Sequence, residues 1–124
     1  MAPRKAAPSA QQRLLSLIEE TLDQGQAEDV SVIDLSGKSS IADYLVIASG
    51  RSGRHLNTLA ERVVEALREK GIRPVPVEGM ANAEWVLVDA GDVIVHLFRP
   101  EKRRFYNLEK MWGLDLPDLA EASA

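Results

Sequence analysis

The sequence contains no cysteine, which excludes a disulfide framework and thiolate chemistry and suits a cytosolic protein. It also lacks any apolar run of the ~20 residues that a membrane-spanning helix needs. The first stretch, MAPRKAAPSA, carries Arg4 and Lys5 but no apolar segment behind them, so it does not have the pattern of a secretory signal. We therefore expect a cytoplasmic protein without a membrane segment.

Basic side chains are too few for a protein that binds nucleic acid mainly by neutralising phosphates. The sequence has 15 lysines and arginines against 19 aspartates and glutamates, which gives a net charge of −4. An acidic protein of this kind suits a basic partner, or a partner without charge. Its 124 residues, 45% of them apolar and 27% charged, are enough for one globular domain with a core of its own.

Apolar residues recur at helical spacing in three parts of the chain. Serine or glycine caps the start of the second helix, and glycines end the first two. We expect helices from Gln11 to Gly25, from Ser52 or Gly53 to Gly71, and from Pro100 onward. In the last of these, Phe105, Leu108 and Trp112 form the inward-facing stripe.

Short β-branched or apolar runs predict the strands. The run YLVIAS is continuously apolar, which suits a strand covered on both faces, and the two prolines of RPVPVEG suit an edge strand. The expected strands are residues 30–35, 44–49, 73–79, 85–88 and 93–98, the last two joined by a tight turn. Together with the helices, they predict an α/β (α+β) fold with a mixed sheet of about five strands and helices packed on it. The expected domain is residues 11–113, between a disordered tail at 1–10 and an acidic, frayed tail at 114–124.

Catalytic and metal-binding patterns are weak. A nucleotidyltransferase holds divalent metal with clustered carboxylates, but the loop GKSSIADY supplies only Asp43, and no D-x-D pair follows on the neighbouring strand. His55 and His96 are far apart in the chain and lack ligand spacing. We expect Asp43 to cap a turn and His96 to be partly buried and hydrogen-bonded to the backbone. The sequence therefore predicts no catalytic residue, no metal site and no cofactor.

The segment SGRSGRH places Arg51, Arg54 and His55 at the start of a helix, where free N–H groups attract anions. It lacks the spacing of a phosphate-binding loop, so an ordinary strand-to-helix turn is the favoured interpretation. A contact with a phosphate group stays open as the alternative.

Two aromatic residues are candidates for an interface. Tyr106 lies about 100° around the last helix from Phe105, which places it on the flank beside Glu109. Trp85 opens a strand near several carboxylates, and a core position is the competing interpretation for it. Aromatic side chains in such surroundings suit the docking of a basic protein, because they give a large contact area at low entropic cost.

Three blocks of sequence resemble the ribosomal silencing factor family, also called Iojap-like proteins: GKSSIADYLVIASGRSGRH, EGMANAEWVLVDAGDVIVHLF and PEKRRFYNLEKMW. The resemblance covers roughly residues 11–113. It implies binding to the large ribosomal subunit through ribosomal protein L fourteen, which keeps the small subunit away and slows translation. It also implies a nucleotidyltransferase-like fold without evident transferase activity, and a homodimer in some members.

We therefore expect a translational repressor that acts by steric exclusion. The predicted partner-binding residues are Trp85, Tyr106, Glu84, Asp89, Asp92 and Glu109, and the candidate RNA or anion contacts are Arg51, Arg54 and Arg103. Two alternatives stay open, a large-subunit assembly factor that contacts ribosomal RNA and a nucleotidyltransferase-like enzyme.

Overall fold

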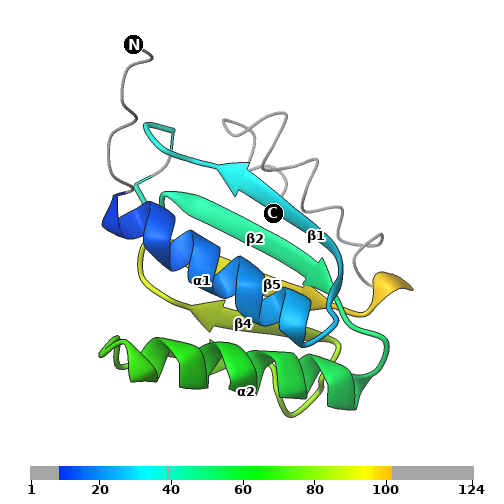
Figure 1. Cartoon of the computed structure of the whole chain (residues 1–124). Coiled ribbons are helices and arrows are strands. Elements are labelled where there is room, and N and C mark those ends of the chain that lie inside the picture. The colour runs from blue at the N-terminus through cyan, green and yellow to red at the C-terminus, as the bar shows by residue number, and fades with distance from the viewer. Residues whose placement is uncertain (1–8, 39, 102–124) are drawn as a thin grey trace.

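Two helices and five strands form the described part of the chain (Figure 1). A computed structural model of the protein describes residues 9–38 and 40–101. The elements are α1 (Ala10–Gln24), β1 (Glu28–Asp34), β2 (Tyr44–Ser49), α2 (Gly53–Glu69), β3 (Val77–Glu78), β4 (Trp85–Asp89) and β5 (Val93–Phe98). Neither helix is long and apolar enough to cross a membrane, a finding that covers the described ranges alone.

The strands form one mixed sheet in the order β1-β2-β5-β4-β3. The central pair, β2 and β5, is parallel, and the other three pairs are antiparallel. This confirms the predicted mixed sheet of five strands with helices packed on it. The proline-rich segment supplies β3 at one edge, as expected, although only Val77 and Glu78 pair with β4.

Both helices cover the same face of the sheet, in front of it in Figure 1. Ser9 and Gln12 form a capping box at the start of α1, and the Ser52 hydroxyl caps α2 by accepting from the backbone N–H of His55. Apolar residues at helical spacing then bury one stripe of each helix against the sheet. The fully buried residues are Ile18 and Leu22 in α1 and Leu56, Leu59, Ala60, Val63 and Leu67 in α2.

The opposite face of the sheet carries a second apolar cluster. Successive residues of a strand point to opposite faces, so Val46 and Ala48 of β2 join the helix-side core, while Leu45 and Ile47 join the second cluster. Its fully buried members are Leu35, Leu45, Ile47 and Phe98. The prediction that YLVIAS is covered on both faces is thus confirmed.

Two strands start away from the expected residue: β3 begins at Val77 and not at Arg73, and β1 begins at Glu28 and not at Val30. The register with β2 shifts between Glu28 and Ser31, and Asp29 has a φ of 50°, which marks an irregularity in the strand. The first two residues of the strand, Glu28 and Asp29, are acidic, so the β-branched pattern used to predict the strand does not include them. The helix expected from Pro100, with its inward stripe, lies outside the described residues after Glu101.

Candidate interaction site

Three aromatic rings gather on the face of the sheet opposite α1 and α2. Trp85 of β4 pairs with Phe98 of β5, and Leu87 pairs with His96, so strand alternation places all four side chains on this face. We call Trp85, His96 and Phe98 the aromatic cluster. Its ring centroids are 5.2 Å apart for Trp85 and Phe98, 5.7 Å for Trp85 and His96, and 6.2 Å for His96 and Phe98.

A hydrogen bond joins two members of the aromatic cluster. The indole Nε1–H of Trp85 donates to Nδ1 of His96 over 2.9 Å. A neutral imidazole has one donor and one acceptor nitrogen, so the bond places the proton of His96 on Nε2. The expected bond of His96 to the backbone was wrong, because its partner at Nδ1 is the Trp85 side chain.

Burial increases across the aromatic cluster from Trp85 to Phe98. Phe98 is fully buried, His96 is 7% exposed and Trp85 is partly buried. Burial lowers the pKa of His96 to about 4, since a charged imidazole loses its hydration there. His96 is therefore neutral at pH 7. Trp85 joins the second apolar cluster at its margin and keeps part of its surface open to solvent.

The carboxylates near Trp85 lie at both ends of β4. Glu84 precedes the tryptophan, and its carbonyl accepts from the backbone N–H of Arg99 over 3.3 Å. Asp89 and Asp92 flank the turn at the other end, about 13 Å along the strand from Trp85 at ~3.3 Å per residue. Glu84 is thus next to Trp85 along the chain, whereas Asp89 and Asp92 lie at the far end of β4.

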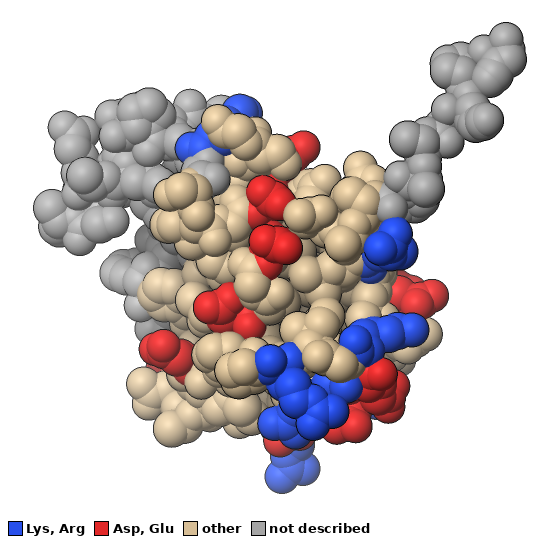
Figure 2. Space-filling view, turned by 90° about the vertical axis from the view of Figure 1, so that its left-hand side faces the viewer, with Lys and Arg blue, Asp and Glu red and all other residues tan. Residues whose placement is uncertain are grey.

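Asp89 and Asp92 belong to an acidic end of the sheet. Asp89 accepts from the N–H of Gly91 over 2.8 Å, and the carbonyl of Asp92 accepts from the N–H groups of Asp43 and Tyr44. Asp34 ends β1 at the same side by its pairing with Tyr44. Figure 2 looks at the side where β1 and β4 end and shows acidic side chains across its middle, with lysines and arginines grouped below.

These carboxylates do not come together as ligands. Within residues 9–38 and 40–101, no three His, Asp or Glu side chains form a group that could hold a metal ion. Hydrogen bonds from Ser36 lower the pKa of the exposed Asp34 carboxyl, with a smaller contribution from Lys38. The backbone N–H of Asp43 donates to the carbonyl of Asp92, and this bond joins the β4–β5 turn to the start of β2. The turn cap expected of the Asp43 side chain stays a prediction.

In the strand-to-helix turn after β2, both ring nitrogens of His55 have hydrogen-bond partners within the protein. Nδ1 of His55 accepts from the backbone N–H of Arg51, and its Nε2 lies 2.9 Å from the carbonyl of Gly25. The second contact ties the start of α2 to the end of α1. This geometry favours an ordinary turn, while the anion contacts assigned to Arg51 and Arg54 stay a prediction.

A comparison with protein families gives one match across nearly the whole chain. The model described as "Ribosomal silencing factor during starvation" matches residues 7–123. The chain belongs to the ribosomal silencing factor family. The resemblance of the three sequence blocks is thereby confirmed.

Relatives in this family span most of its length. A ribosomal silencing factor of Zymomonas mobilis is 50% identical over 113 residues, which are 90% of this chain and 85% of the relative. A mouse protein named "Mitochondrial assembly of ribosomal large subunit protein 1" is 35% identical over 103 residues, 81% of this chain and 45% of that longer protein. A crystal structure of a Chromobacterium violaceum protein, 37% identical, superposes with a TM-score of 0.81 over 85% of this chain and 88% of its own.

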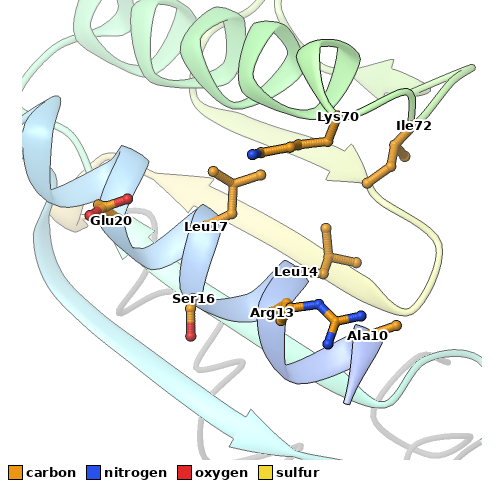
Figure 3. A pocket seen from close by; sticks show the side chains of 8 residues that line it. All are labelled: Ala10, Arg13, Leu14, Ser16, Leu17, Glu20, Lys70 and Ile72. Carbon is orange, nitrogen blue, oxygen red and sulfur yellow. The ribbon is translucent and has the colours of Figure 1, made fainter. Parts of the chain in front are cut away.

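This family member also has an open groove on its helix side (Figure 3). The groove has a volume of about 670 Å³ and is lined by Ala10, Arg13, Leu14, Ser16, Leu17, Glu20, Lys70 and Ile72. In Figure 3 the Lys70 side chain reaches from the end of α2 over Leu17 of α1. Leu14 and Leu17 line the groove and are only partly buried, and both also pack against the helix-side core.

The contact residues predicted from the sequence stay predictions, and the structure adds a neighbour of Trp85 that the sequence did not indicate. His96 was not expected to take part, because its contact with Trp85 depends on a register that a sequence does not display. Near the end of the described chain, the guanidinium of Arg99 pairs with Glu101 over 2.8 Å. The predicted site residues Arg103, Tyr106 and Glu109 lie outside the described residues.

Proposed function

We propose that this protein is a non-enzymatic translational repressor that binds the large ribosomal subunit and blocks joining of the small subunit. The observation that carries the proposal is the match to the silencing factor family over residues 7–123. The aromatic cluster supports the proposal with a candidate contact surface, because Trp85 is only partly buried on the hairpin of β4 and β5. The repressor works in the cytoplasm by occupying a surface, and no bond is made or broken.

The proposed partner on the subunit is ribosomal protein L fourteen. Trp85 and Tyr106 supply most of the binding energy, since buried aromatic anchors dominate many interfaces. In the sequence, Glu84 directly precedes Trp85 and Glu109 follows Tyr106 by three positions, while Asp89 and Asp92 act from the far end of β4. Their negative charge steers a basic partner and sets its orientation more than it adds affinity.

Contacts with ribosomal RNA are a minor part of the proposal. Arg51 and Arg54 lie at the exposed start of α2, and Arg103 is assigned to the same role from the sequence alone. A homodimer is the further state we propose in solution, in competition with ribosome binding if it uses the same face. Sedimentation at several protein concentrations, with and without the ribosomal partner, measures that competition.

The docking surface is tested by replacing Trp85. We expect Trp85→Ala to weaken binding to purified large subunits by about 1 kcal/mol or more, because the indole contact is lost. Co-sedimentation over a range of protein concentrations gives the affinity. Glu20→Gln is the matched control, since Glu20 lines the groove on the helix side and lies away from the aromatic cluster. Equal affinity of Trp85→Ala and the wild type would remove Trp85 from the docking surface.

A second candidate function is assembly of the large subunit. It is favoured by the mouse relative, whose name assigns it to assembly of the mitochondrial ribosomal large subunit. An assembly factor that works on RNA binds protein-free ribosomal RNA, with an affinity that falls steeply as salt rises. The repressor account predicts weak binding to that RNA and strong binding to complete large subunits.

A further inference from the structure

We propose that His96 is a positioning residue whose Nδ1 holds the Trp85 indole in the orientation that meets the partner. The proposal rests on the proposed function, because it takes Trp85 to be a contact residue. It adds a role for a buried residue that acts through Trp85.

The geometry restrains the indole at two points. Its Nε1–H is held by His96 at 2.9 Å, and its ring stacks on Phe98 with 5.2 Å between centroids and 25° between planes. A tryptophan side chain has only two rotatable bonds, so a hydrogen bond and a stacking contact together leave it one orientation. A side chain ordered before binding loses less entropy when the partner arrives.

His96 is itself a rigid support. It lies in the middle of β5, a central strand, and pairs with Ile47 of β2 on one side and Leu87 of β4 on the other. With 7% of its surface exposed, it has little freedom to move. Binding groups placed on strands and held by buried neighbours keep their geometry better than groups on loops.

An apolar side chain at position 96 would be buried at a lower cost in folding free energy than an imidazole. The neighbours of His96 on this face are Ile47, Leu87, Ile94 and Phe98, and burying an imidazole among such residues is unfavourable unless its polar atoms are used. The polar interaction found at Nδ1 is the bond to Trp85. The imidazole of His96 therefore orients the indole of Trp85, which a leucine at position 96 could not do.

The tautomer of His96 in the wild-type protein is the first test. Nitrogen chemical shifts from long-range ¹H–¹⁵N spectra at pH 7 distinguish the two neutral forms. We expect a proton on Nε2 and a bare Nδ1, with a Trp85 indole N–H that exchanges slowly with solvent. The indole signal is assigned as the one missing in Trp85→Phe. A proton on Nδ1 would overturn the proposal, because the two N–H groups would then face each other.

Two substitutions at His96 give the functional test. His96→Leu keeps the volume and removes the acceptor, whereas His96→Asn keeps an oxygen acceptor near the place of Nδ1. We expect His96→Leu to bind purified large subunits roughly 3- to 10-fold more weakly, the range that one hydrogen bond supplies. His96→Asn should recover most of that affinity. Thermal melts of both variants establish that they fold.

The outcomes separate this proposal from the proposed function. If Trp85→Ala weakens binding while folded His96→Leu binds as well as the wild type, the positioning role is wrong and the docking surface stands. If His96→Asn binds as weakly as His96→Leu, the acceptor is not what matters, and the proposal also fails. If Trp85→Ala binds like the wild type, the docking surface fails and takes the positioning role with it.

Discussion

At the scale of single residues, the pair of Trp85 and His96 shows how much a sequence conceals. The two residues are 11 positions apart, and their contact runs diagonally across a hairpin. The apolar run VIVHLF predicts a strand, but it does not predict which side chain of β4 lies beside the histidine. A shift of one residue in register would turn Trp85 to the helix side and break the pair.

The burial of His96 predicts a pH dependence of stability. Its folded pKa of about 4 lies below the ordinary 6.5 of the unfolded chain, so the unfolded state binds the proton first as pH falls. Stability is then lost between pH 6.5 and pH 4 and is fully present above pH 6.5. The contribution is roughly 3 kcal/mol, at ~1.36 kcal/mol per pKa unit.

Urea unfolding at pH 7 and pH 4.5 measures this effect. Carboxylates titrate in the same range, so the informative quantity is the difference between the wild type and His96→Leu. We expect the wild type to lose roughly 2–3 kcal/mol more than His96→Leu between the two pH values. A parallel loss in both proteins would show that His96 is not the titrating group.

At the scale of elements, the sequence predicted the bounds of a strand or helix best where its apolar pattern is uninterrupted or its start is capped. The bounds of β2 and β5 agree with the runs YLVIAS and VIVHLF, and α2 starts at the expected serine cap. The start of β1 was missed because a positive φ at Asp29 and two acidic residues interrupt the β-branched pattern.

The loop before β4 is predicted to depend on Gly79. Its φ is +93°, and a Cβ there would clash with the backbone carbonyl of Trp85. The loop is also tied to α2, since the Asn57 amide donates to the carbonyl of Met80 over 3.1 Å. We expect Gly79→Ala to destabilise the fold by at least ~2 kcal/mol, because strain and clash add.

Gly71→Ala is the matched control for that substitution. Gly71 has a similar φ of +83°, but nothing lies within 4 Å of the position that a Cβ would take. We expect it to cost about 1–2 kcal/mol from backbone strain alone. Urea denaturation compares the two variants, and an equal loss in both would contradict the close approach of Gly79 to Trp85.

At the scale of the whole molecule, the fold separates two faces. Both helices and the groove lie on one side of the sheet, and the aromatic cluster lies on the other. The acidic end of the sheet and the aromatic cluster lie at opposite ends of β4. A basic partner that spans the hairpin would meet the indole at one end and Asp89 and Asp92 at the other, which explains why a net charge of −4 suits a protein target better than RNA.

Subunit joining in the presence of this protein tests the central claim most directly. Light scattering reports the association of purified large and small subunits as the protein is titrated, while co-sedimentation gives the fraction of large subunits that it occupies. We predict that joining falls in proportion to that occupancy, and that Trp85→Ala requires a correspondingly higher concentration. Normal joining by large subunits that are saturated with the protein would contradict the account.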